Sequence, residues 1–158
     1  MKFLYQLCLL IIIFLMNSCS NQPETFTFQS KFGYTIELPK NWDEYKDEKN
    51  TNAFFNTSNW TGNLRITPIK INQNKREQLL IDEVKSLGSK ATLLTTHSGF
   101  SGLKFSEESG EDFIYYWYLF AKDRMFICSF TIDTNQKDSN KNKEELLLVS
   151  GIINSLKL

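Results

Sequence analysis

The clearest hydrophobic pattern of the chain lies between residues 112 and 133 and predicts two long strands folded back on each other. Residues 113–120 are apolar or aromatic at every position, which is typical of a strand covered on both faces. Residues 125–132 alternate more cleanly, with Cys128 on the more apolar face. Ala-Lys-Asp-Arg between them is polar enough for a tight turn, although it lacks the Asn-Gly of the strongest hairpin signal. The pattern therefore predicts a β-hairpin in the middle of a sheet.

Shorter alternating stretches predict six further strands, over residues 25–28, 32–38, 53–55, 64–71, 92–96 and 100–106. Pro39 lacks an amide donor, so it ends the second of these strands or lies at its edge. The alternation of the fourth strand changes phase at Pro68, which predicts a bulge or a sheet edge there. The charged segment 43–49 is interpreted as a solvated loop or a short surface helix.

Two helices are predicted from apolar side chains that recur every three or four residues. The first spans Asn74 to Gly88, with Asn74 as its candidate cap, and the second spans about Asn142 to Leu156. We expect both helices to pack as layers over the sheet. The predicted fold class is therefore α+β, a mainly antiparallel β-sheet with flanking helices, in a single globular domain from residue 25 to residue 158.

The amino-terminal residues 1–18 have the pattern of a signal peptide. Lys2 precedes an apolar run over residues 7–16, and small polar residues follow. The run is too short to cross a bilayer comfortably, because a membrane-spanning helix needs about 20 apolar residues. Its length and its flanks are typical of a secretory signal.

Residues 15–20, Leu-Met-Asn-Ser-Cys-Ser, resemble the lipobox of bacterial lipoproteins. In that family signal peptidase II cuts before the cysteine, whose thiol and freed amine are both acylated. Met16 departs from the usual leucine of the motif, whereas Ser18 and Cys19 match it. The resemblance implies lipidation at Cys19, a tether over residues 19–24, and a place in the cell envelope. The alternative is an ordinary cleaved signal or an uncleaved anchor with an incidental cysteine.

The absence of an aspartate after Cys19 is, by the rule known for enteric bacteria, a sign against retention in the inner membrane. We therefore expect an anchor in the outer membrane, on its periplasmic or surface side. Charge adds one exclusion: from residue 19 onward the chain carries 17 basic and 18 acidic residues, which argues against a general nucleic-acid binder. With Cys19 acylated, Cys128 is the one remaining thiol, so no internal disulfide is expected and Cys128 is interpreted as a buried core residue.

A second resemblance covers most of the chain. Residues 32–42, Phe-Gly-Tyr-Thr-Ile-Glu-Leu-Pro-Lys-Asn-Trp, resemble the opening segment F-x-Y-x-[IV]-x-x-P-x-x-W of the PsbP-like superfamily. That superfamily includes the extrinsic P subunit of photosystem II, the Ran-binding Mog-type protein and many small bacterial lipoproteins of unknown function. The resemblance implies a PsbP-like α/β/α sandwich and no shared active site, so no catalytic residue is transferred. Trp42, at the end of the motif, is interpreted as a lid over the core, with a ligand contact as the alternative.

Candidate chemistry is sparse. His97 is the only histidine, and a zinc site needs three or four converging ligands, so neither a metal nor another cofactor is expected. A Ser/His pair at His97 and Ser98 is disfavoured because neighbours on a turn rarely point at each other, and no Gly-x-Ser-x-Gly elbow accompanies them. The acidic clusters 82–83 and 107–112 are interpreted as solvated charge. The sequence thus favours a protein that is not an enzyme.

Two binding functions remain. The first is a protein-binding or assembly module of the cell envelope, and the second is a carrier of a small apolar ligand or lipid in a cleft of the sheet. Candidate binding-surface residues are the aromatic ones Trp60, Tyr116, Trp117 and Tyr118. Trp60 lies in a polar loop and is interpreted as tucked back onto its own sheet, with an exposed indole as the alternative. An open cleft of a few hundred Å³ lined by the aromatics favours the carrier, whereas a filled interior with an exposed apolar patch favours the partner.

Overall fold

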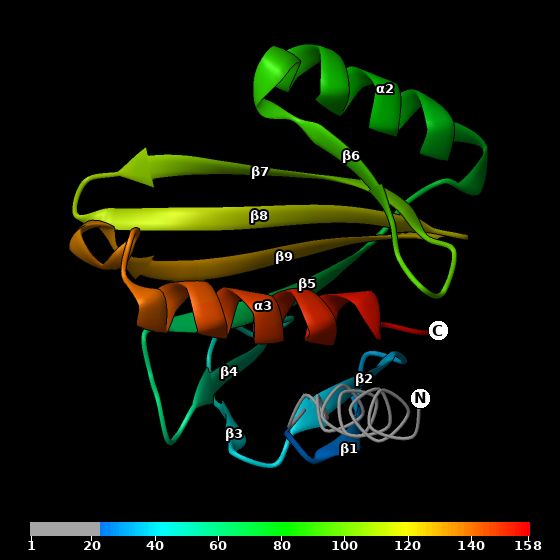
Figure 1. Cartoon of the computed structure of the whole chain (residues 1–158). Coiled ribbons are helices and arrows are strands. Elements are labelled where there is room, and N and C mark those ends of the chain that lie inside the picture. Colours follow the sequence, from blue (N-terminus) through cyan, green and yellow to red (C-terminus); the bar gives the residue numbers. More distant parts are fainter. Residues whose placement is uncertain (1–22) are drawn as a thin grey trace, which may run out of the picture.

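The computed structural model describes residues 23–158. The expected signal peptide, the lipidation residue Cys19 and most of the tether lie outside these residues. Seven antiparallel strands form the main sheet in the order β3-β4-β5-β9-β8-β7-β6, and β1 pairs with β2 in a separate hairpin (Figure 1). The strands are β1 Thr25–Gln29, β2 Thr35–Pro39, β3 Trp42–Tyr45, β4 Asn52–Asn56, β5 Gly62–Lys70, β6 Thr92–Thr95, β7 Ser101–Ser109, β8 Asp112–Ala121 and β9 Arg124–Asp133, and the α-helices are α2 Arg76–Leu87 and α3 Asn140–Asn154. The predicted fold class, mainly antiparallel α+β, is confirmed.

The predicted long hairpin is β8 and β9, which pair without interruption from Asp112 and Asp133 to the turn. Lys122 opens that turn with a φ of 48°, the positive value that a two-residue hairpin loop requires in its first central position. β9 also pairs with β5 over nine residues. The three strands β5, β9 and β8 therefore form the middle of the sheet.

One face of the main sheet, here called the inner face, is covered by α3 and by the β1–β2 hairpin (Figure 1). The register places Leu64, Phe130 and Tyr115 next to one another on this face. Val149 and Ile153 of α3 pack onto it. Nearly all of the fully buried apolar side chains belong to this one layer, so the inner face forms the hydrophobic core.

Two predictions about single core residues are confirmed. Cys128 lies on the inner face with no exposed surface, and burial raises the pKa of its thiol far above the ordinary value, so the thiol is protonated and inert. Trp42 is 1% exposed and belongs to the core cluster, as expected for a residue that closes one end of the core.

The opposite face, here called the outer face, is covered far less. α2 contacts β7 near one end of the sheet, and none of its residues is buried. Tyr116 and Tyr118 of β8 stay partly exposed on this face. The prediction that β8 is covered on both faces is therefore wrong for its outer side, and α2 is a peripheral helix rather than a full layer.

Two local predictions need correction, and a third is decided between its alternatives. The charged segment after Trp42 begins as an edge strand, β3, and not as a loop or a helix. In this strand Asp43 pairs with Phe55 of β4. Asn74 does not cap α2, since a short 3-10 turn, capped by Asn72, precedes the helix. Of the two alternatives predicted for Pro68, the sheet edge is confirmed and the bulge is wrong. β5 keeps its register with β9 through Pro68, whereas the pairing with β4 stops at Ile66 and leaves one side of Pro68 unpaired.

A buried hydrogen-bond network joins the β1–β2 hairpin to the main sheet. Asn52 of β4 accepts hydrogen bonds at its side-chain oxygen from the Ser30 hydroxyl, at 2.6 Å, and from the Tyr34 hydroxyl, at 2.7 Å. Its amide nitrogen donates to Glu44 of β3. Ser30, Tyr34 and Asn52 are all nearly inaccessible to solvent, so each of these groups depends on the network for its hydrogen bonds.

We expect Asn52→Ala to lower the free energy of unfolding by about 2–4 kcal/mol, because it leaves two buried hydroxyl groups without their acceptor. Urea unfolding followed by tryptophan fluorescence measures the loss. Thr27→Ala, which removes the exposed hydrogen bond to Glu37, is the matched control and should cost less than about 0.5 kcal/mol. Equal losses in the two variants would contradict a structural role for the Asn52 network.

Candidate functional site

The four aromatic residues proposed from the sequence do not form one site. Trp117 is 6% exposed and lies on the inner face, so it does not share an exposed surface with Tyr116 and Tyr118. Tyr116 and Tyr118 lie on the outer face, half-buried. Trp60 lies in the β4–β5 loop and is 60% exposed, so the interpretation that it is tucked back onto its own sheet is wrong. The strand alternation separated Trp117 from its neighbours correctly but could not tell which face is covered.

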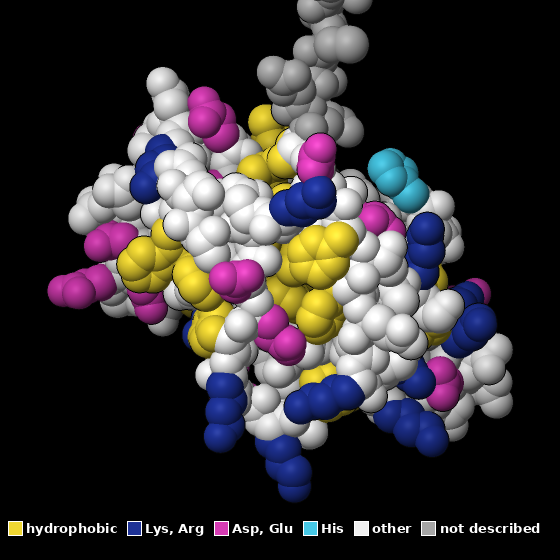
Figure 2. Space-filling view, turned by 90° about the horizontal axis from the view of Figure 1, so that it is seen from below, with side chains coloured by type: hydrophobic (Ala, Val, Ile, Leu, Met, Phe, Trp, Pro, Cys, Tyr) yellow, Lys and Arg dark blue, Asp and Glu magenta, His cyan; other side chains and the backbone are white. Residues whose placement is uncertain are grey.

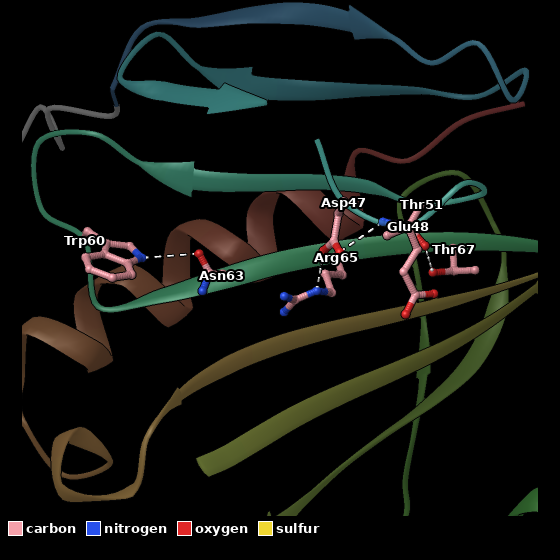
Figure 3. A network of polar contacts seen from close by, with 7 residues as sticks. All are labelled: Asp47, Glu48, Thr51, Trp60, Asn63, Arg65 and Thr67. Atoms are coloured by element: carbon pink, nitrogen blue, oxygen red, sulfur yellow. Dashed lines mark hydrogen bonds and ion pairs between the residues drawn. The ribbon is translucent and has the colours of Figure 1, made fainter. Parts of the chain in front are cut away.

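Trp60 is held in place although it is exposed. Its indole N–H donates to Asn63 on β5 at 3.3 Å (Figure 3). The side-chain oxygen of Asn56, at the end of β4, accepts from the backbone N–H groups of residues 58 and 59, both at 3.0 Å, and from the Asn41 amide at 3.0 Å. This pattern of an asparagine bonding to the backbone two and three residues on fixes the shape of the loop.

Helix α3 fixes the other end of the same loop. The Thr61 backbone N–H donates to the Glu145 carboxylate at 2.8 Å, and the Thr61 hydroxyl donates to the same oxygen. The Lys141 ammonium donates to the Trp60 carbonyl at 3.0 Å. A surface hollow of about 480 Å³ lies beside the indole, between the loop and the start of α3. Trp60 is therefore displayed on a loop that is ordered before any partner arrives.

Glu145 is unusual because it is a carboxylate with only 1% exposed surface. Burial raises the pKa of Glu145, and the hydrogen bonds from Thr61 and the charge of Lys141 oppose this rise only in part. One oxygen of Glu145 and the side-chain oxygen of Asn142, one turn earlier in α3, have no hydrogen-bond partner among the described residues. The link between α3 and the Trp60 loop is thus a buried polar cluster whose proton content affects stability.

The outer face combines aromatic and polar side chains. Phe105 stacks on Tyr116 with ring centres 4.8 Å apart, and it meets Tyr118 edge to face at 5.2 Å. Burial and the nearby Glu107 raise the pKa of Tyr116 above the ordinary tyrosine value. Figure 3 views β5 from the outer side, with α3 behind the strand. It shows the ion pair between Arg65 of β5 and Asp47 on the segment after β3, in which Nε and Oδ2 are 2.6 Å apart.

Other exposed hydrophobic side chains are scattered. Figure 2 shows the molecule from below, where hydrophobic side chains reach the surface at separate places between charged ones. Among the described residues the large, strongly exposed ones lie on different elements and include Phe26, Leu93 and Leu147. Isolated apolar side chains are normal on protein surfaces. Trp60 differs from them in its size and in the network that holds its loop.

A groove opens on the inner face between α3 and the strands at the β6 end of the sheet. Its volume is about 270 Å³, and the residues of its lining that face the inner side are Lys90, Thr92, Lys104, Ser106, Tyr115, Trp117, Leu146 and Ser150. Sequence reasoning named the aromatic side chains but missed the two lysines and the α3 residues. No local pattern could have revealed them, because the groove exists only where α3 stops covering the sheet.

The described residues give no sign of a catalytic centre. Ser98 donates its hydroxyl to the Leu156 carbonyl at 2.6 Å, so the hydroxyl is not directed at His97. Within residues 23–158 no three His, Cys, Asp or Glu side chains lie close enough together to hold a metal ion. None of the helices in that part of the chain has the length and apolar character needed to cross a bilayer.

Comparison with known proteins first defines the class: the chain has a PsbP-like fold. It is similar to the solution structure of cyanobacterial PsbP (CyanoP) from Synechocystis sp. PCC 6803, with a TM-score of 0.52 and 10% identity, over 89% of this chain and 96% of that one. It is also similar to a crystal structure from Bacteroides thetaiotaomicron VPI-5482, with a TM-score of 0.64 and 24% identity, over 86% of this chain. The chain spans 48% of that second protein, about half its length. Identities this low show the fold alone.

The family model described as "Domain of unknown function (DUF3805)" matches residues 26–157, and the chain belongs to this family. No curated protein sequence matches the chain. The superfamily resemblance inferred from residues 32–42 is thus confirmed at the level of the fold.

We expect stability to depend on pH through Glu145. Because burial raises the pKa of Glu145, the folded chain keeps this proton to higher pH than the unfolded chain does. The free energy of unfolding therefore falls as the pH rises from about 4.3, the ordinary glutamate value, through the raised value in the folded protein. Glu145→Gln should remove this decline in urea unfolding measured from about pH 4 to pH 7.

Glu144→Gln is the matched control, because Glu144 is the exposed neighbour on the same helix. It should leave the pH dependence as in the wild type. An identical decline of stability with pH in wild type and Glu145→Gln would contradict the account of Glu145.

Proposed function

We propose that this protein is a non-catalytic lipoprotein of the bacterial cell envelope that binds a protein partner, or supports assembly, at the membrane surface. The observation that carries the proposal is the exposed Trp60 on a loop that α3 holds in place. Tryptophan is enriched among the few residues that dominate binding energy at protein interfaces. No group of side chains in the described part of the chain suggests a reaction.

The order of the Trp60 loop favours binding in energetic terms. A loop that must be ordered on association loses conformational entropy, and that loss weakens binding. Here the hydrogen bonds of Asn56, Lys141 and Glu145 have already fixed the backbone around the indole. A partner that covers the ring would bury the exposed 60% of Trp60, at little further entropic cost, where a whole aromatic residue buries about 150–250 Å².

The membrane part of the proposal rests on Cys19, which lies outside the described residues. Two or more acyl chains hold a protein firmly on a bilayer, whereas one chain holds it only marginally. β1 begins at Thr25, six residues after Cys19. Six extended residues reach about 20 Å, so an acylated Cys19 keeps the domain close to the membrane surface. In this arrangement the partner is a protein of the same envelope compartment, and no nucleic acid or cofactor is involved.

A second candidate function, carriage of a small apolar ligand or lipid, is favoured by one specific observation. The inner-face groove has a volume of about 270 Å³ and includes Tyr115 and Trp117 in its lining. Ligand pockets of proteins typically measure about 300–1,000 Å³, so the groove suits a small ligand. The Trp60 loop and the groove lie at different places on the fold, and either function can be tested without the other.

We expect Trp60→Ala to weaken partner binding by at least about 30-fold, since truncation of a central interface residue costs about 2 kcal/mol or more. Cross-linking in intact cells followed by affinity capture of the full chain measures the loss. Leu147→Ala is the matched control, because Leu147 is 74% exposed on the surface of α3. A partner captured equally by wild type and Trp60→Ala would contradict a binding role for Trp60.

We expect Cys19→Ala to abolish fatty-acid labelling and membrane fractionation of the protein, because the variant lacks the thiol that is acylated. Metabolic labelling with an alkyne fatty acid and fractionation of cell extracts provide the readouts. The variant Cys8→Ala, which alters the other amino-terminal cysteine, should label and fractionate like the wild type. If Cys19→Ala still carries label and stays with membranes, the lipoprotein assignment is wrong.

A further inference from the structure

The groove on the inner face is an uncovered part of the sheet with two walls. Figure 1 shows that β7 and β8 run between α3 and β6 with no helix over them on this side. The register places Thr92, Lys104 and Trp117 in one row across β6, β7 and β8, and Ser106 beside Tyr115 in the next row. These rows form the floor of the groove. Residues of α3 form one wall, and the turn before β6 forms the other.

The charges around the groove are positive. Lys104 projects from the floor, and Lys90 lies in the short 3-10 turn before β6. Neither lysine forms an ion pair with a described residue, and no carboxylate lines the groove. The acidic residues of β7 are engaged elsewhere: Glu108 pairs with Lys137 at 3.0 Å, and Glu107 lies beside Tyr116. Two lysines therefore line the groove, and neither has a carboxylate partner among the described residues.

The remaining surface of the groove is aromatic and apolar. Trp117 keeps 6% of its surface exposed, and the ring of Tyr115 lies beside it with centroids 6.5 Å apart. Leu146 of α3 closes the apolar side. The Tyr115 hydroxyl accepts a hydrogen bond from the Asn142 amide at 3.2 Å, and its own proton has no acceptor among the described residues. The groove thus offers a flat apolar surface, a hydroxyl donor and two cations.

We infer that this groove binds a small amphiphilic anion, with a flat apolar body on Trp117 and Leu146 and a carboxylate or phosphate group between Lys90 and Lys104. This inference rests on the second candidate function, ligand carriage, and adds the charge and size of the ligand. Aromatic side chains favour offset or edge contacts with a flat ring. Lysines without a carboxylate partner favour an anion, because an anion accepts charge-assisted hydrogen bonds from them. A neutral lipid lacks these bonds and is expected to bind more weakly.

The test uses three soluble probes that share one body and differ in the head group: 3-phenylpropionate, 3-phenylpropyl phosphate and the neutral 3-phenylpropanol. Each is titrated into the ¹⁵N-labelled full chain held in phosphatidylcholine nanodiscs, and two-dimensional NMR follows every resolved amide and indole N–H. We expect shifts that cluster at Lys104, Trp117 and Ser150 with at least one anionic probe. The alcohol should bind at least about tenfold more weakly than that anionic probe. Added salt should weaken the binding of the anionic probe and leave the binding of the alcohol unchanged.

Matched variants separate the lysines from general effects. Lys90→Met and Lys104→Met should each weaken binding of the anion by about three- to tenfold. Lys70→Met, which alters an exposed lysine outside the groove, should leave binding unchanged. Ser150→Phe fills the groove from α3 without removing a charge and should abolish binding. An unchanged amide spectrum of each free variant away from the substitution shows that it remains folded.

Two results overturn the inference, and they differ in what they mean for ligand carriage. If the alcohol binds in the groove as tightly as the anions and the lysine variants match the wild type, the groove takes neutral ligands, and the carrier function survives without the anion. If no probe shifts groove residues at millimolar concentration, both the inference and the carrier function fail. Shifts confined to one of the two anions support the inference and identify the preferred head group.

Discussion

The structure depends on one constraint: a single helix and a two-stranded hairpin must cover one face of a seven-stranded sheet. Seven strands span about 29 Å at a spacing of about 4.8 Å. A helix with its side chains is about 10–12 Å wide, and α3, with 15 residues, is about 22 Å long. Figure 1 shows α3 running along the sheet with the β1–β2 hairpin beside it. Together they bury the middle strands and leave part of the β6–β7 end of the inner face open.

This constraint explains why the surface features are close to α3. The apolar stripe of α3, with Val149 and Ile153, closes the core. Its amino-terminal half supplies Lys141 and Glu145, which hold the Trp60 loop, and Leu146 and Ser150 form a wall of the groove. The Asn52 network holds the hairpin that completes the cover. One helix therefore connects the stability of the core with both candidate binding features.

The sequence predicted those features that depend on local periodicity. Side-chain patterns that repeat every two residues indicate strands, and those that repeat every three to four indicate helices. They predicted the β8–β9 hairpin, most of the other strands and both helices, and with them the burial of Cys128 and Trp42. β3 escaped prediction because its first residues after Trp42 are charged and become a strand only by pairing with β4. The exposure of Trp60 also could not be predicted, since its loop is held by Glu145, 84 positions away from Thr61. The groove lysines became a candidate site only once the docking of α3 was known.

The most direct test of the account is a photo-cross-linking experiment in intact cells. The photoreactive residue p-benzoylphenylalanine replaces Ser58, exposed in the Trp60 loop, in one variant and Leu147, exposed on α3, in another, so that Trp60 itself is kept. We predict that the probe at position 58 cross-links to one envelope protein in a defined adduct, whereas the probe at position 147 does not. The absence of an adduct at position 58, or the same adducts from both positions, would contradict the claim that the Trp60 loop is the contact surface for a protein partner.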